Sequence, residues 1–298
     1  MKVWYSACAV VVLVLPLLAA APEVPPVGIE MRNVHLHVAA DAVLEVRWLR
    51  GRLHSVSAHP PVFDDQQSFT MAIQDGEIAI DAASLTALVN HAFDYKGAAL
   101  SNLRVGFESG QLAQHGTLKK GIRVPFSIVA TVAATPDGTM RMHPVKVKTA
   151  GVPTAKLMSL FGVELDDIIK SRPDRGIVFH DNDLFLDPSR MLPPPRTTGT
   201  LTRAVVRGDR LVQVFGRGAA GAATGGGNYI WFRGGNIRFG RLLMSDADLK
   251  LIDMDPKDPF DFYSAKYNDQ LVAGYSKNTP QKALRTYMPD YADLRTKR

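Results

Sequence analysis

Residues 69–93, FTMAIQDGEIAIDAASLTALVNHAF, contain the two kinds of pattern from which the fold is predicted. Apolar and polar residues alternate from Phe69 to Asp81, which is typical of a half-buried β-strand. Asp75-Gly76 interrupts this alternation, and an Asp-Gly pair between two alternating runs predicts a hairpin turn. Asp81 is a good helix N-cap. It is followed at helical spacing by Leu85, Leu88, Val89, Ala92 and Phe93, which predicts a helix packed on the sheet.

Similar alternation recurs on both sides of this stretch. Val34, Leu36 and Val38 alternate with polar residues, and residues 44–48 repeat the pattern. Residues 135–138, TPDG, predict a turn between two strands. The further strand predictions are residues 103–108, 111–118, 122–134, 140–148, 176–180, 184–186, 199–206 and 210–215.

A second helix is predicted after Pro153, which suits the first position of a helix. Apolar residues then cover about half of the helix circumference at 100° per residue. So wide an apolar face predicts a helix embraced by the sheet. Neither helix lies in a strand–helix–strand series, so we expect an antiparallel α+β fold. The apolar residues are Leu157, Met158, Leu160, Phe161, Leu165, Ile168 and Ile169.

The order of these segments resembles a known family. The segments are DAASLTALVNHAF (81–93), LSNLRVGFESGQLAQHGTLKKGIRVPFSI (100–128), KTAGVPTAKLMSLFGVEL (148–165), IVFHDNDLFLDPSRMLPPP (177–195) and GTLTRAVVRGDRLVQVFG (199–216). Residues 28–218 resemble bacterial envelope proteins of uncharacterised function related to the tubular lipid-binding superfamily, which includes the bactericidal permeability-increasing protein (BPI). The resemblance implies a BPI-like half-barrel, with a strongly curved antiparallel sheet wrapped around one or two long amphipathic helices and an apolar groove between them.

The resemblance also implies a lipid site without catalytic residues. The two predicted helices would line the groove and bind acyl chains through Leu85, Leu88, Val89, Phe93, Leu157, Leu160, Phe161, Leu165, Ile168 and Ile169. The predicted function is therefore an exported, non-catalytic protein that binds or shuttles a lipid. The alternatives are an interaction or structural protein of the envelope with a closed core, and a hydrolase or metal-dependent enzyme.

Residues 1–21 have the pattern of a secretory signal peptide. Lys2 precedes an uncharged run, residues 3–22, which contains three consecutive alanines at its end. This pattern is typical of a signal removed after export, here after Ala20 or Ala21. An uncleaved inner-membrane anchor is the alternative, since about 20 apolar residues can span a bilayer. Both predict a periplasmic or cell-envelope protein, with residues 219–298 forming a Gly-rich hinge and an extension.

Composition limits cofactors and partners. Of the 298 residues, 46% are hydrophobic and 21% charged, which is an ordinary globular balance. Cys8 is the single cysteine, so the exported part offers no disulfide and no cysteine metal ligand. The net charge of +6 is scattered. It predicts a solvated surface, or a peripheral contact with an anionic membrane, rather than nucleic-acid binding. No cofactor or metal is predicted, and other envelope proteins are the remaining partners.

Two short motifs suggest other chemistry. Gly216, Gly218 and Gly221 match a dinucleotide fingerprint, but the Gly/Ala-rich residues that follow are unsuited to the helix this site requires. We interpret them as a hinge. His35 and His37 point the same way from a strand but have no third metal ligand placed by the sequence.

Two denser segments follow in the extension. Asp253, Asp255, Asp258 and Asp261 lack the glycine and glutamate of a calcium-binding loop. We interpret this run as a rigid acidic loop, with calcium binding as the alternative. Residues 228–241 interleave aromatic residues with arginines. This pattern suits an ordinary strand or a membrane-interface segment.

Overall fold

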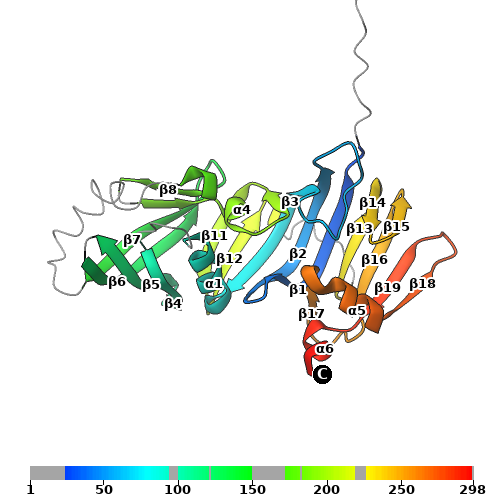
Figure 1. The fold of residues 1–298 in the computed structure, drawn as a ribbon. Coiled ribbons are helices and arrows are strands. Elements are labelled where there is room, and N and C mark those ends of the chain that lie inside the picture. The colour runs from blue at the N-terminus through cyan, green and yellow to red at the C-terminus, as the bar shows by residue number, and fades with distance from the viewer. Residues whose placement is uncertain are drawn as a thin grey trace, which may run out of the picture.

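The structure is a computed structural model that describes residues 24–93, 100–120, 122–149, 172–181, 183–218 and 226–296. The described residues form an elongated, mostly β molecule (Figure 1). An 11-stranded sheet and a 6-stranded sheet follow one another along its length, and a small two-stranded sheet completes it. Among the described residues, no helix is long and apolar enough to cross a membrane.

The large sheet combines strands from both ends of the described chain. Its main path runs in the order β11-β12-β3-β2-β1-β13-β16-β19-β18, while β10 pairs with β3 and β17 with β1. The β10–β3, β17–β1 and β16–β19 pairs are parallel. The strands are β1 (Val27–Ala39), β2 (Ala42–Ser55), β3 (Phe69–Asp81), β10 (Arg196–Thr198), β11 (Leu201–Arg207), β12 (Arg210–Phe215), β13 (Tyr229–Arg233), β16 (Asp248–Asp253), β17 (Phe260–Tyr263), β18 (Tyr275–Asn278) and β19 (Leu284–Met288).

The second sheet has the order β4-β5-β6-β7-β9-β8. The predicted turn at residues 135–138 is confirmed, because the Gly138 N–H donates to the Thr135 carbonyl at 3.0 Å between β6 and β7. The strands are β4 (Leu100–Glu108), β5 (Gln111–Lys120), β6 (Ile122–Ala134), β7 (Met140–Thr149), β8 (Ile177–His180) and β9 (Asp183–Leu186), and the two-stranded sheet holds β14 (Asn236–Phe239) and β15 (Leu242–Ser245).

The predicted hairpin at Asp75-Gly76 is wrong, because both residues lie inside the continuous strand β3. Opposite β2, Asp75 pairs with Arg50 and Ile73 with Gly51, which leaves Gln74 as the extra residue of a β-bulge. The Asp75 carboxylate accepts a hydrogen bond from Arg50 at 2.6 Å. Pairing with the long strand β2 on one side, and of Gly76 with the end of β12 on the other, therefore overrides the local preference of the Asp-Gly pair for a turn.

The first predicted helix is confirmed as α1 (Ala82–Ala92). The Asp81 side chain caps it by accepting a hydrogen bond from the Ser84 N–H at 2.7 Å. Its apolar residues Leu85, Leu88 and Val89 are buried against the sheets. The other described helical segments are shorter: η1 (Pro173–Arg175), α4 (Pro188–Met191), η3 (Ser264–Lys266), α5 (Tyr267–Ala273) and α6 (Tyr291–Thr296).

The predicted half-barrel wrapped around long amphipathic helices is contradicted by the described residues. The fold is mostly β, the described helices are short, and the sheets are neither strongly curled nor closed. The physical reason is that an apolar sheet face needs a cover but not a particular kind of cover. Here short segments and other strands pack against it, and the aromatic ring of Phe63 lies 4.7 Å from that of Phe239 and 5.6 Å from that of Phe232.

The second predicted helix, after Pro153, lies outside the described residues. The predicted groove residues Leu157, Leu160, Phe161, Leu165, Ile168 and Ile169 fall in that part of the chain. Residues 226–296 are described, and they extend the large sheet, since β13 pairs antiparallel with β1.

Candidate functional site

Two apolar cavities lie beneath residues 188–198, which we call the covering segment. The first has a volume of about 80 Å³ and the second about 60 Å³. Leu44, Leu192 and Thr197 line both, so the two cavities lie side by side, and we call them together the apolar channel. Among the described residues, the other polar side chains along the channel are Gln66, Gln213 and Ser264, and no charged side chain lines it.

Alternating strand residues build the walls of the channel. In β1, Ile29 and Met31 face the first cavity, and in β13 Ile230 and Phe232 do the same. Intervening residues point to the opposite face of the sheet, because side chains alternate along a strand. The two apolar sets come from distant parts of the chain but meet because β1 and β13 are paired.

The covering segment can lie over an apolar channel without burying unpaired donors. It contains α4, then Pro193-Pro194-Pro195, then β10, and α4 is drawn across the face of the large sheet in Figure 1. Proline has no backbone N–H, so these residues leave no donor to satisfy. The buried hydroxyl of Thr197 donates to the Pro195 carbonyl at 3.2 Å, so its polar group is also satisfied.

A third, more open cavity of about 240 Å³ adjoins the channel. Leu192 lines all three cavities, so the third lies next to the channel, and we call it the vestibule. The vestibule carries the basic side chains of Arg175, Arg190 and His91. The Arg175 guanidinium is positioned by donating to the carbonyl of Ala92 at 3.0 Å.

The Arg190 guanidinium is held at two points, at the Pro173 carbonyl and the Asp187 carboxylate, both at 3.0 Å. Two of the residues that line the vestibule are thus arginines held in place by hydrogen bonds in or beside short helices. Because guanidinium groups match carboxylate and phosphate geometry, the vestibule can bind an anionic group next to the apolar channel.

The predicted lipid-binding residues divide into three groups. Leu85 and Leu88 line the second cavity. Val89 and Phe93 are buried in the core but do not line the three cavities. The residues predicted between 157 and 169 lie outside the described part of the chain. Sequence reasoning missed Leu44, Leu192 and Thr197, although the Leu-Pro-Pro-Pro run was a signal for an unusual cover.

The other sequence motifs have local roles. Gly216 has φ +55°, and a Cβ there would lie 2.0 Å from the Gln74 carbonyl oxygen, so close backbone approach requires this glycine. His37 does not face a metal-ligand set; its Nε2 lies 2.5 Å from Asp261 Oδ1 on β17.

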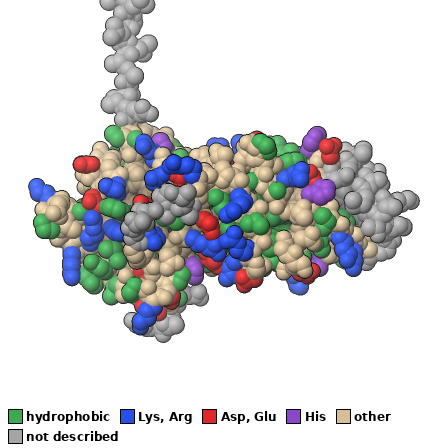
Figure 2. All heavy atoms as spheres, turned by 180° about the vertical axis from the view of Figure 1, so that it is seen from behind, with side chains coloured by type: hydrophobic (Ala, Val, Ile, Leu, Met, Phe, Trp, Pro, Cys, Tyr) green, Lys and Arg blue, Asp and Glu red, His purple; other side chains and the backbone are tan. Residues whose placement is uncertain are grey.

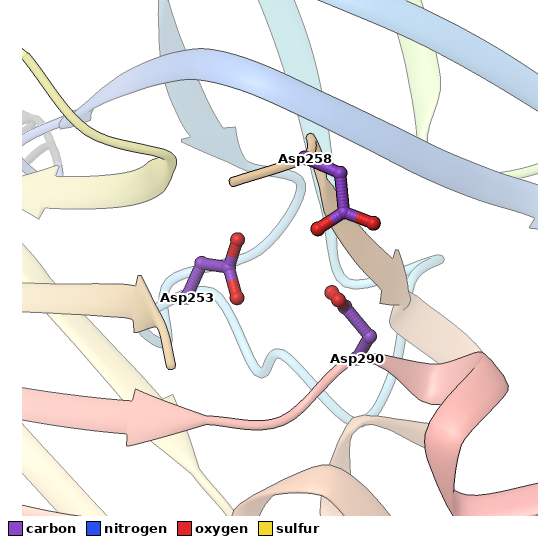
Figure 3. A group of neighbouring side chains, drawn as sticks. All are labelled: Asp253, Asp258 and Asp290. Atoms are coloured by element: carbon purple, nitrogen blue, oxygen red, sulfur yellow. The ribbon is translucent and has the colours of Figure 1, made fainter. Parts of the chain in front are cut away.

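The acidic run forms a three-carboxylate cluster (Figure 3). The cluster contains Asp253, at the end of β16, Asp258, before β17, and Asp290, after β19, with carboxylate oxygens within 4.8 Å of one another. Asp253 and Asp290 are buried and Asp258 is exposed. Asp290 was not part of the predicted acidic run, and it joins the cluster because β19 pairs with β16.

Hydrogen bonds satisfy the two buried carboxylates. Asp253 accepts from the Asn228 side chain at 2.9 Å and from the Asp255 N–H at 2.8 Å. Asp290 accepts from the Asp261 N–H at 2.7 Å. Hard cations such as Ca²⁺ favour carboxylate oxygens, so these three aspartates are the residues that could hold one.

The cluster has a proton-binding character. Burial raises the pKa of Asp290 to about 7, with Asp253 and Asp258 adding to the rise and the Asp261 N–H opposing it. Burial also raises the pKa of Asp253. Neighbouring carboxylates of this kind bind protons jointly, because ionising one disfavours ionising the next.

We expect Asp290→Asn to stabilise the protein at about pH 8 and to have little effect near pH 4. The folded pKa lies above the unfolded value, so the folded state binds an extra proton between them and stability falls as pH rises through about 7. Asn keeps the acceptor for the Asp261 N–H and removes the charge. The expected gain in unfolding free energy at pH 8 is about 1–3 kcal/mol, measured by urea denaturation.

The matched control is Asp246→Asn, at an exposed position, for which we expect the same small effect at both pH values. A gain from Asp290→Asn that is equal at both pH values would contradict proton binding at Asp290. If calcium removed the difference in unfolding free energy of the wild-type protein between pH 4 and pH 8, the cluster would instead be a cation site.

Comparison with known proteins gave no match to a family model, to a curated protein or to a solved structure.

Proposed function

We propose that this protein is an exported, non-catalytic lipid-binding protein of the cell envelope, which holds an acyl chain in the apolar channel. The observation that supports this most is that two cavities without charged side chains lie next to a vestibule lined by two arginines. An amphiphile with one apolar chain and one anionic head matches this arrangement, with its chain in the channel and its head in the vestibule. Burying a methylene in apolar surroundings contributes about 0.8 kcal/mol, so a few buried methylenes supply substantial affinity.

The size of the channel sets how the ligand enters. The two cavities, of about 80 and 60 Å³, are together close to the roughly 150 Å³ of an engineered apolar cavity that binds benzene. The channel as described accepts a short apolar segment. A longer acyl chain requires the covering segment to move outward, and this segment is attached to the sheet edge by the short strand β10, which pairs with β3 over three residues.

Native mass spectrometry of the protein purified from its own envelope tests the proposal. We expect discrete added masses that disappear on organic extraction, followed by rebinding of an offered fatty acid. A fatty alcohol of the same chain length should bind more weakly by about tenfold, since it lacks the charge that the vestibule arginines recognise. A bare polypeptide that takes up neither ligand would contradict the proposal and favour an interaction protein with a closed core.

A further inference from the structure

The sheet face opposite the channel carries a row of four charged residues and one tryptophan. The strand registers place Glu30, Trp231, Lys250, Arg285 and Lys277 next to one another, from β1 through β13, β16 and β19 to β18. The row lies opposite the channel because Trp231 alternates with Ile230 and Phe232, which line the first cavity. Basic side chains therefore collect on the side of the sheet that does not hold the channel.

A second row, one step along the strands, is rich in aromatic residues. It includes Tyr229, Tyr287 and Tyr275, again in register across β13, β16, β19 and β18. The rings of Tyr275 and Tyr287 stack with centroids 4.8 Å apart. The two rows thus place basic residues next to aromatic rings on one face of the sheet, with Ile252 as the β16 member of the second row.

Cation–π contacts join the two rows. The Lys250 ammonium lies 3.4 Å from the ring centroid of Tyr229 and 5.0 Å from that of Trp231. The guanidinium carbon of Arg233 lies 4.3 Å from Trp231, and the Lys277 ammonium 5.2 Å from Tyr275. We call Trp231, Arg233, Lys250, Tyr275, Lys277 and Arg285 the basic-aromatic face.

The acidic residues beside this face are already engaged. Asp248 accepts hydrogen bonds from the Trp231 indole at 2.7 Å and from Arg285 at 2.9 Å. Glu30 accepts from the Tyr229 hydroxyl at 2.5 Å. Arg233 and Lys277 are exposed, and Figure 2 shows exposed Lys and Arg side chains at the end of the molecule that holds these strands. The face therefore presents net positive charge with aromatic rings beneath it.

We propose that the basic-aromatic face docks on the surface of a lipid bilayer that contains anionic headgroups. Lys and Arg near such a surface are attracted to it, and tyrosine and tryptophan rings favour the headgroup level. The uncharged run of residues 3–22 leads into β1, whose second residue, Gly28, pairs with Arg233. Docking here leaves the channel and its covering segment on the free side.

Vesicle flotation tests this docking surface. The full chain is mixed with phosphatidylcholine vesicles that either contain or lack phosphatidylglycerol. Any contribution of the apolar residues 3–22 to binding is then the same for the two kinds of vesicle. We expect preferential binding to the anionic vesicles. Arg233→Glu with Lys277→Glu should reduce that preference by at least about tenfold. Both positions are exposed, so the fold should be kept, as checked by urea denaturation.

The control reverses two exposed lysines of the smaller sheet, Lys146→Glu with Lys148→Glu on β7. It changes net charge by the same amount and should leave vesicle binding within about twofold of wild type. If both double variants lost the same amount of binding to anionic vesicles, overall charge would explain the effect and the proposal would be overturned. Wild-type binding that ignores phosphatidylglycerol would also overturn it, as would tighter binding to a DNA oligomer than to anionic vesicles. Channel variants should bind vesicles normally, which separates this proposal from the lipid-carrying function.

Discussion

Leu192→Trp is expected to lower the affinity for a fatty acid at least tenfold while the protein remains folded. Leu192 lines both channel cavities and the vestibule, so a larger side chain there occupies the space where ligand would pass from one to the next. Displacing two methylenes costs about 1.6 kcal/mol, which corresponds to more than a tenfold change in dissociation constant. Displacement of a fluorescent fatty-acid probe measures the affinity.

Val178→Trp is the matched control for this substitution. Val178 lies on β8 of the smaller sheet and is 37% exposed, so a tryptophan there adds the same indole away from the channel. We expect wild-type binding. If Leu192→Trp folds normally and binds the probe like wild type, the channel is not the lipid site.

The second large effect is expected for Phe232→Ala, in the wall of the first cavity. The Phe232 side chain is fully buried and contacts the rings of Phe63 and Phe239. Removing a buried phenylalanine costs about 3–5 kcal/mol, because packing is lost and a cavity is left. This substitution also enlarges the channel, so a bound acyl chain should restore more stability in the variant than it adds to wild type.

Phe260→Ala separates the two consequences. Phe260 is equally buried and packs on Phe262, but it does not line the cavities. Phe260→Ala should destabilise the protein by a similar amount. A fatty acid should raise the unfolding free energy of this variant only as much as it raises that of the wild type. Urea denaturation with and without ligand measures both quantities. If the fatty acid stabilised Phe232→Ala and Phe260→Ala equally, the first cavity would not be part of the lipid site.

The two halves of the lipid proposal rest on different forces. Affinity for the chain comes from apolar burial, which is insensitive to salt, whereas the contribution of the vestibule arginines weakens as salt screens charge. The basic-aromatic face depends on charge as well, but it lies on the other side of the sheet. Lipid uptake and membrane docking are therefore separable by substitution, although both involve the same strands.

Local patterns were sufficient for much of the secondary structure. The alternation in β1, β2 and the strands of the smaller sheet, and the cap and apolar stripe of α1, depend on neighbours a few residues away. The sequence therefore determined these elements directly. It also placed Leu85 and Leu88 on the inner face of α1, and both line the channel.

Only the tertiary structure decided which of these elements meet. The Asp75-Gly76 pair stayed inside β3 because β2 pairs with both residues and β12 pairs with Gly76. Asp290 joined Asp253 because β19 pairs with β16, and the covering segment brought Leu192 to the same cavities as Leu44. Sequence periodicity shows which face of a strand is apolar. What covers that face depends on contacts between residues far apart in the chain, and in the described part of this protein short segments and strands form the cover where the sequence suggested long helices.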